Sequence, residues 1–270
     1  MALPRRGKID PAAPPTLLLT GAANGIGRAT ARLLATRGFR LGLIDREAEP
    51  LRALRDELRQ QGARVAVCDA DVRDLARLTD AVRAIEDELG GTEILLACAG
   101  VGGISSSVNL ELESLRLMLE VNVLGVAHAI GAVLPGMFSR NEGHLVAISS
   151  VAGYRGMPWM PGYSASKAAL TTYLEGLRPG LKRRGVRITT VFPGFVRTRL
   201  TAPTPFRHPV PMLEPEQAAV PIVRAILRQP RDVVFPAHVS VGMSLLRSFP
   251  NRLYDFVMDR AGPRALTHEF

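Results

Sequence analysis

The sequence predicts an α/β fold in which helices cover both faces of a doubly wound parallel sheet, giving three α/β/α layers. Short apolar runs alternate with amphipathic, helix-like stretches through the first 195 residues of the 270-residue chain. The apolar runs are hydrophobic on both faces, which is typical of strands buried between two layers of helices. Glycines such as Gly38, Gly62 and Gly185 close the amphipathic stretches, as expected at helix ends.

Each element is predicted from its length, its apolar pattern and the turn residues around it. The predicted strands are Thr16–Thr20, Phe39–Asp45, Arg64–Asp69, Ile94–Ala99, His144–Ser149, Arg187–Phe192 and Asp232–Phe235. The predicted helices are Ile26–Thr36, Glu47–Gln61, Leu75–Leu89, Leu115–Phe138, Ala165–Arg184 and Glu216–Arg228.

We expect a single domain with a C-terminal extension. Residues 1–14 are short, basic and proline-rich, and they are predicted to form a flexible leader. Residues 15–238 are predicted to hold the sheet, with a proline-rich loop at 199–215 that covers the substrate side. Residues 239–270 form an amphipathic extension, for which we keep two readings: it packs on the domain or a neighbouring subunit, or it touches a membrane surface.

Composition narrows the classes of function. Hydrophobic residues make up 47% of the chain, and no apolar run was expected to reach the roughly 20 residues that span a membrane. The net charge is +9, but the arginines are scattered and lack interleaved aromatic residues, so nucleic-acid binding is not expected. Cys68 and Cys98 lie in apolar runs, which favours buried free thiols and a cytoplasmic location.

A glycine-rich turn, Thr20–Gly27, joins the first strand to the first helix. Glycines let the backbone approach a phosphate closely, and the helix start offers unpaired amides, so this turn predicts a dinucleotide site. Asp45 ends the second strand, where a carboxylate can accept both ribose hydroxyls and repel a 2′-phosphate, which favours NAD. Arg46 follows and can instead pair with a 2′-phosphate, so NADP stays open as the alternative.

Tyr163 and Lys167 are four residues apart, so a helix places both side chains on one face. An ammonium one turn away is expected to favour the phenolate and to lower the pKa of the tyrosine from about 10. The pair alone is weak, because the same spacing in many helices is only a surface contact.

Together with these motifs, the segments Asp71–Val72, Cys98–Gly100, Asn122–Gly125, Ser149–Ser150 and Pro193–Gly194 occur in order. With them the chain resembles the short-chain dehydrogenase/reductase family over about residues 14–200. The resemblance implies a Rossmann-type fold, one NAD(P) site, no metal, and a homodimer or homotetramer built from the helices beginning near Leu115 and Tyr163. One departure is Ala97-Cys98-Ala99-Gly100, where the family usually has Asn-Asn-Ala-Gly.

The resemblance also implies roles for single residues. Tyr163 is expected to transfer the proton, Lys167 to tune Tyr163 and hold the nicotinamide ribose, and Ser150, with Ser149 as runner-up, to hydrogen-bond the substrate oxygen. Asn122 is expected to position a water that links Lys167 to solvent. The residues expected to contact the cofactor are Gly21, Asn24, Gly25, Ile26, Gly27, Asp45, Arg46, Asp71, Val72, Ala99, Gly100, Tyr163, Lys167, Pro193, Gly194, Val196 and Thr198.

The sequence thus predicts an NAD(P)-dependent oxidoreductase that interconverts a secondary alcohol and a ketone. An apolar substrate, such as a sterol-, retinoid- or fatty-acyl-like compound, is expected from the side chains Met157, Trp159, Met160, Phe206, Met212 and Leu213. These side chains can equally pack the loop onto the core. The alternative function is a non-catalytic NAD(P)-sensing regulatory protein on the same fold. Nucleotide-sugar epimerase or dehydratase chemistry is disfavoured, because only a short segment follows Thr198.

Overall fold

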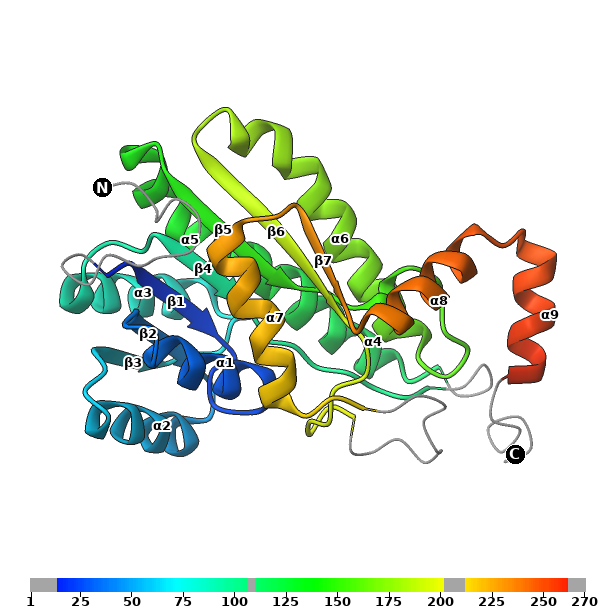
Figure 1. Ribbon diagram of the computed structural model, residues 1–270, viewed down its shortest axis with the longest axis horizontal. Coiled ribbons are helices and arrows are strands. Elements are labelled where there is room, and N and C mark those ends of the chain that lie inside the picture. Colours follow the sequence, from blue (N-terminus) through cyan, green and yellow to red (C-terminus); the bar gives the residue numbers. More distant parts are fainter. Residues whose placement is uncertain (1–13, 106–109, 202–211, 262–270) are drawn as a thin grey trace.

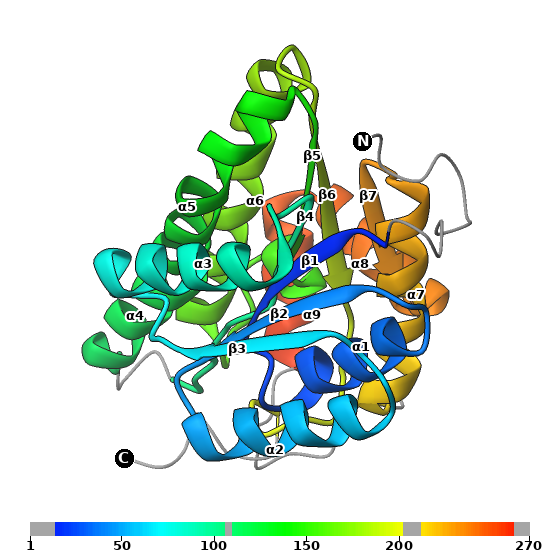
Figure 2. The same cartoon turned by 90° about the vertical axis from the view of Figure 1, so that its left-hand side faces the viewer.

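The computed structural model describes residues 14–105, 110–201 and 212–261, which form one parallel sheet with helices on both faces (Figures 1 and 2). The strands are β1 (Thr16–Thr20), β2 (Arg40–Asp45), β3 (Val65–Asp69), β4 (Ile94–Ala97), β5 (Gly143–Ile148), β6 (Val186–Pro193) and β7 (Asp232–Phe235). The helices are α1 (Gly25–Ala35), α2 (Ala48–Gln60), α3 (Leu75–Leu89), α4 (Leu112–Leu119), α5 (Gly125–Arg140), α6 (Pro161–Lys182), α7 (Pro215–Arg228), α8 (Ala237–Ser248) and α9 (Asn251–Ala261). A π-helical segment, η1 (Glu120–Leu124), joins α4 to α5, and a 3-10 turn, η2 (Val151–Gly153), follows β5.

The sheet has the strand order β3-β2-β1-β4-β5-β6-β7, and all neighbouring strands are parallel. The chain winds outward from β1 to β3 and then returns to β4 on the other side of β1. At such a reversal the loops after the two central strands diverge, so a crevice opens at their carboxyl ends. The predicted doubly wound, three-layer fold is confirmed.

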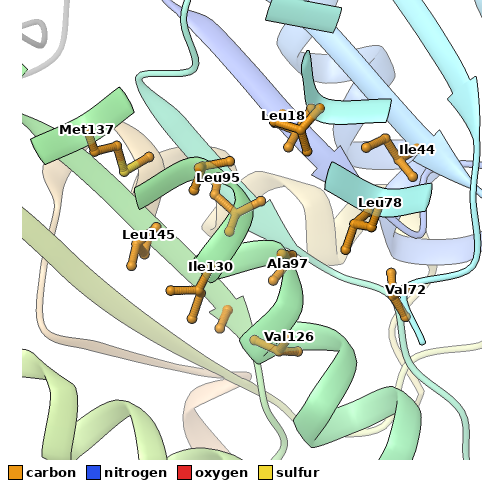
Figure 3. Close-up of a cluster of buried hydrophobic side chains, with 14 of the residues drawn as sticks. Leu18, Ile44, Val72, Leu78, Leu95, Ala97, Val126, Ile130, Met137 and Leu145 are labelled. Atoms are coloured by element: carbon orange, nitrogen blue, oxygen red, sulfur yellow. The ribbon is translucent and has the colours of Figure 1, made fainter. Parts of the chain in front are cut away.

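The core consists of two layers, one on each face of the sheet. Successive strand residues point to opposite faces, so Leu18 and Leu95 pack toward α3 and α5, whereas Leu17 and Leu19 pack toward α1, α2 and α7. Figure 3 shows the first layer, in which Leu78 of α3 and Ile130 of α5 meet the strands. Both layers are fully buried, which holds the strand ends in fixed relative positions.

The helical run Leu112–Arg140 contains an 18-residue window with a mean hydropathy of 1.8, so by length and composition it is long and apolar enough to cross a membrane. The expectation that no stretch reaches this length was therefore wrong. Val126, Ile130 and Val133 of this run belong to the core layer that packs on the sheet. Its apolar composition is that of a helix buried against β4 and β5.

Two predicted helices differ from the observed ones by more than one residue, and the C-terminal extension is helical. The segment predicted as one helix over Leu115–Phe138 begins at Leu112 and contains η1. Helix α6 begins at Pro161 rather than Ala165, because proline is well tolerated in the first turn, where its missing N–H has no helical partner. The described part of the amphipathic extension predicted over residues 239–270 forms two helices, because Pro250 holds Phe249 in an extended conformation (φ −67°, ψ 137°) that ends α8.

His144 of β5 is fully buried, and its Nε2 lies 2.9 Å from Oγ1 of Thr189. The Thr189 hydroxyl donates to the carbonyl oxygen of Pro230, so Nε2 carries the proton and donates to Thr189. Burial, with a smaller contribution from the Arg187 charge, lowers the pKa of His144 to about 3. The ring is therefore neutral in the folded protein at every pH near neutrality.

This burial predicts how the stability depends on pH. The unfolded chain binds a proton at His144 below pH about 6.5, whereas the folded protein does so only near pH 3, so stability is complete above 6.5 and falls below it. Between pH 7.5 and 5.0 the free energy of unfolding should fall by about 2 kcal/mol more in the wild type than in a His144→Asn variant. Urea titrations at both pH values measure this difference. Equal pH dependence in the two proteins would contradict it.

Candidate functional site

A cavity of about 450 Å³ lies at the carboxyl ends of the strands, at the reversal between β1 and β4. Every residue that the sequence assigned to the cofactor lines this cavity, as do Ser149 and Ser150. These residues come from the ends of six strands, from β1 to β6, and from the first turns of α1 and α6. The fold therefore gathers them without a second domain.

The glycine-rich turn closes the floor of the cavity. Gly21 has a φ of +75°, and a Cβ there would lie 2.6 Å from the Ala99 Cα and N atoms. A Cβ on Gly27 would lie 2.0 Å from the Gly21 carbonyl oxygen. Any side chain at either position would push the turn away from the backbone that follows β4.

The start of α1 and Asp45 form one wall. The side chain of the cap residue Asn24 makes no capping bond, so the amides in the first turn of α1 have no partner within the helix. Such amides and the helix dipole favour a bound anion. Asp45 is held at the rim because its Oδ2 accepts from the Ala23 amide (2.9 Å) and its Oδ1 from the Glu47 amide (3.0 Å).

Tyr163, Lys167 and Ser150 meet at the inner end of the cavity. Because α6 starts at Pro161, Tyr163 and Lys167 lie on successive turns, with Lys167 Nζ 5.8 Å from the Tyr163 ring centroid. Lys167 is buried, and its Nζ donates to the Ile148 carbonyl oxygen (2.9 Å). The Ser150 side chain hydrogen-bonds with Tyr163 and also accepts from the Ala152 amide (3.1 Å).

Burial controls the protonation of both groups. It raises the pKa of Tyr163 above its usual value of 10, and the hydrogen bond with Ser150 only partly opposes this rise. It lowers the pKa of Lys167 from 10.5 to about 8. The expected lowering of the tyrosine pKa by the ammonium is therefore not found, because desolvation of the phenolate is the larger effect. At neutral pH the site holds a neutral phenol beside a charged amine.

Asn122 lies behind the cavity wall, in the π-helical segment. Its Oδ1 accepts from the Val101 amide and its Nδ2 donates to the Val101 carbonyl oxygen, both at 2.9 Å, while Nδ2 also donates to Ser166 Oγ (2.9 Å). Asn122 thus ties the loop after β4 to α6, the helix that carries Tyr163 and Lys167. π-Helical turns inside α-helices occur frequently at functional sites.

Other predicted residues have structural partners. Ser149 points toward α6, where its hydroxyl bonds with the Lys167 carbonyl oxygen (3.2 Å) and Thr171 Oγ1 (3.0 Å). Asp71 pairs with the guanidinium of Arg73 (2.7 Å), which lowers the pKa of that carboxyl group. Cys98 lines the cavity, and burial raises the pKa of its thiol to about 12.

The substrate side differs from the sequence-based expectation. Met157, Trp159, Met160, Met212 and Leu213 are partly exposed but do not line the cavity, and Phe206 lies outside the described residues. The cavity is instead lined there by Val101, Gly102, Leu200 and Thr201. A Cβ on Gly102 would lie 2.8 Å from Leu200, so the loops after β4 and β6 touch above the site. Only the position of these residues just after predicted strands could have indicated them.

Glu47 and Arg199 also line the cavity and were not predicted. Arg199 Nη1 lies 2.9 Å from Glu47 Oε2, which joins the loop after β6 to the loop after β2 across the cavity mouth. The Arg199 side chain is 71% exposed and that of Glu47 is 38% exposed, so solvent screens the pair and it is weak in isolation. Its partners are 152 positions apart, so no local sequence pattern could have revealed it.

Comparisons with known proteins agree with this arrangement. The profile of the short chain dehydrogenase family matches residues 15–206. An uncharacterized oxidoreductase of Myxococcus xanthus is 41% identical over 241 residues, covering 89% of this chain and 94% of the relative. The 17-beta-hydroxysteroid dehydrogenase 13 of Rattus norvegicus is 31% identical over 241 residues, covering 88% of this chain and 80% of the relative.

A solved structure resembles the whole fold. The crystal structure of a short chain dehydrogenase/reductase from Burkholderia phymatum in complex with NAD superposes with a TM-score of 0.79 and 26% identity. It covers 88% of this chain and 94% of the other. The family expected from the sequence is confirmed. The profile match over most of the chain, together with the relatives and the similar solved fold, means that this protein is an oxidoreductase of the short-chain dehydrogenase/reductase family.

Proposed function

We propose that the protein interconverts a secondary alcohol and a ketone with NAD(P) as the hydride carrier. One observation carries the proposal: the cavity that holds the glycine turn and Asp45 also holds Ser150, Tyr163 and Lys167 at its inner end. A dinucleotide bound along the wall formed by α1 and Asp45 would end beside the partly buried phenol of Tyr163 and the buried ammonium of Lys167. A protein that only binds the dinucleotide does not need a phenol and an ammonium at that end of the cavity.

The residues present fit NAD(P). The turn at Gly21 and Gly27 and the uncapped first turn of α1 would hold the pyrophosphate, and Asp45 would hold the adenosine ribose. Asp71 and Val72 would flank the adenine, and Pro193, Gly194, Val196 and Thr198 would line the nicotinamide end. When bound, NAD(P) donates or accepts a hydride at its nicotinamide ring.

The protein supplies the proton and the charge. Tyr163 is protonated at neutral pH, so it can give its proton to a carbonyl oxygen in reduction. In oxidation Tyr163 would first lose its proton, and the phenolate would then take the hydroxyl proton of the alcohol. Lys167 would stabilise the phenolate that forms and hold the nicotinamide ribose. Ser150 would hydrogen-bond the same substrate oxygen, since its hydroxyl already contacts Tyr163.

Asn122 would support this group from behind. Its three hydrogen bonds fix the loop after β4 and Ser166, and Ser166 lies next to Lys167 in α6. We also propose that it positions a water linking Lys167 to solvent, in keeping with the family resemblance.

We infer NAD rather than NADP as the preferred cofactor. The Asp45 carboxylate is fixed by two backbone amides at the rim, so a 2′-phosphate would be repelled. The NAD in the Burkholderia phymatum protein supports this preference. Arg46, which is exposed at the same rim, is the residue that would favour NADP.

We propose an apolar substrate, in the class of sterol-, retinoid- or fatty-acyl-like alcohols and ketones. Val101 and Leu200 line the cavity at the end where the substrate would enter, and Met157, Trp159 and Met160 lie in the segment that leads into α6. The name of the Rattus norvegicus relative, a hydroxysteroid dehydrogenase, supports this class.

We further propose a homodimer or homotetramer in the cytoplasm. Apolar side chains are exposed on the two helical regions expected at the interface, namely Leu112, Leu119 and Leu124 on the α4–α5 run and Tyr173 on α6. The division into residues 1–14, 15–238 and 239–270 stays a prediction, as does peripheral membrane contact by the last of these segments.

Removal of the Tyr163 hydroxyl tests the catalytic role. Tyr163→Phe should lower turnover by on the order of 10³-fold, because the proton donor is lost, while NADH affinity stays within about twofold. A carbonyl library screened with NADH provides the substrate, and fluorescence titration provides the affinity. Tyr173→Phe, at an exposed tyrosine of the same helix, should leave both unchanged. Unchanged turnover in Tyr163→Phe would favour a nucleotide-sensing protein.

The pKa of Lys167 predicts the pH profile of reduction. Below pH about 8 the amine is charged and stabilises the forming phenolate, and above it the charge and this stabilisation are lost. We expect kcat/KM for reduction to be flat below pH 8 and to fall about tenfold per pH unit above it. Lys167→Ala should lose this break, and Lys182→Ala, at an exposed lysine of α6, should keep it. If the wild-type profile shows no break near pH 8, this role of Lys167 is contradicted.

The charge of Asp45 predicts cofactor preference. Asp45→Asn keeps an acceptor for one backbone amide but removes the repulsion, so the ratio of NADPH to NADH affinity should rise by about tenfold or more. Fluorescence titration with both nucleotides measures the ratio. Asp69→Asn, at an exposed carboxylate outside the cavity, is the matched control and should leave it unchanged. A wild type that binds NADPH much more tightly than NADH would overturn the preference.

A further inference from the structure

The C-terminal helices return to the segment that connects Ser150 to Tyr163. Figure 1 shows α8 and α9 beyond the carboxyl end of β7. Val239 of α8 packs with Val151 of η2 and Phe192 of β6, and the Tyr154 ring lies 5.2 Å from the Phe192 ring. The extension thus packs against the end of β6 and against the turn η2, which directly follows Ser150.

Tyr254 makes the main contact of α9 with this segment. Its hydroxyl donates to the carbonyl oxygen of Gly156, 98 positions earlier in the chain. Tyr254 is the buried side chain among those described in α9, with 8% exposure, whereas its neighbours Leu253 and Phe256 are 43% and 54% exposed. An aromatic ring and hydroxyl are therefore directed specifically at residues 154–156.

Arginines reinforce the same contact. The Arg155 guanidinium lies 4.2 Å from the centroid of the Tyr254 ring, and its Nη2 donates to Asn251 Oδ1 (3.4 Å). The Arg247 guanidinium of α8 lies 5.6 Å from the Tyr154 ring. Cation–π contacts on both sides couple the segment to both C-terminal helices.

The rest of the segment is held at two other points. The Met157 amide donates to Ser164 Oγ (3.1 Å) in the first turn of α6, and the Ser105 amide donates to the Trp159 carbonyl oxygen (3.3 Å). Residues 154–160 therefore have supports from α9, from α6 and from the loop after β4. The α9 contact is the one that holds Gly156, a residue without a side chain of its own to pack.

We propose that Tyr254 and Arg155 are positioning residues that set the path of residues 154–160 and so select which substrates reach Tyr163. This inference rests on the proposed function, because residues 154–160 join Ser150 to Tyr163 and would form a wall beside a substrate that extends beyond the cavity lining. Loss of the Tyr254 hydroxyl releases the Gly156 carbonyl, and the wall between Ser150 and Tyr163 then samples more positions. A bulky substrate, which must contact the wall, is affected more than a small one.

The test uses the full-length protein with Tyr254→Phe, which keeps the ring and removes the hydrogen bond. KM for a bulky ketone should rise about fivefold, the effect of one lost hydrogen bond, while kcat for a small ketone changes less than about twofold. Amide hydrogen exchange of residues 154–160 should accelerate by a similar factor, with the strands unchanged. NADH affinity should stay the same, since the Tyr254 contact lies outside the cofactor wall.

Matched variants separate this role from simple support of the helix. Phe256→Ala removes a ring of α9 that contacts Arg260 rather than residues 154–156, and it should change neither KM nor exchange. Arg155→Ala should resemble Tyr254→Phe, and Arg155→Lys should partly restore the wild-type ratio of the two KM values.

The outcomes of these experiments distinguish a failure of the proposed function from a failure of the positioning role alone. A wild type that turns over no carbonyl compound or alcohol overturns the proposed function, and the positioning role with it. A wild type that is active, with the same bulky-to-small KM ratio in Tyr254→Phe, overturns the positioning role alone, whether or not exchange accelerates.

Discussion

The close approach of the Gly21 turn to the backbone after β4 is the constraint on which the site depends. With Gly21 and Ala99 in direct backbone contact, the start of α1 is brought into the crevice between β1 and β4. The Asp45 carboxylate reaches this turn through the Ala23 amide, and Thr198 reaches it from the end of β6. Loops after four strands therefore meet at one turn, and their relative positions follow from the buried, parallel register of the sheet.

The inner end of the cavity, where Tyr163 and Lys167 lie, combines burial with charge. Burial raises the pKa of Tyr163, which therefore stays protonated, and lowers the pKa of Lys167, which therefore loses its proton more readily. A buried ammonium is costly unless it is hydrogen-bonded, and the Ile148 carbonyl oxygen supplies that bond. The site thereby keeps a charge near the phenol at neutral pH, where a proton donor and a stabilised phenolate are both needed.

Much of the fold and of the candidate site could be predicted from the sequence, because it depends on local sequence patterns. β1, α3 and β7 begin and end where the apolar pattern predicts, and the residues of the glycine turn line the cavity as expected. Features that depend on tertiary contacts could not be predicted from the sequence. The π-helical segment around Asn122 has no local composition signal, and the balance between burial and the Lys167 charge at Tyr163 depends on packing. Pro250 marked the break between α8 and α9, but the continuous amphipathic pattern obscured it.

Cys98, where the family usually has asparagine, has a consequence for the chemistry of the cavity wall. A thiol with a pKa of about 12 is ionised in only about one molecule in 10⁵ at pH 7, and the thiolate is the form that reacts. Alkylating agents and peroxides therefore meet almost no nucleophile at this position. The partly exposed Cys98 thus lies on the lining of the cavity with little of its reactive thiolate form.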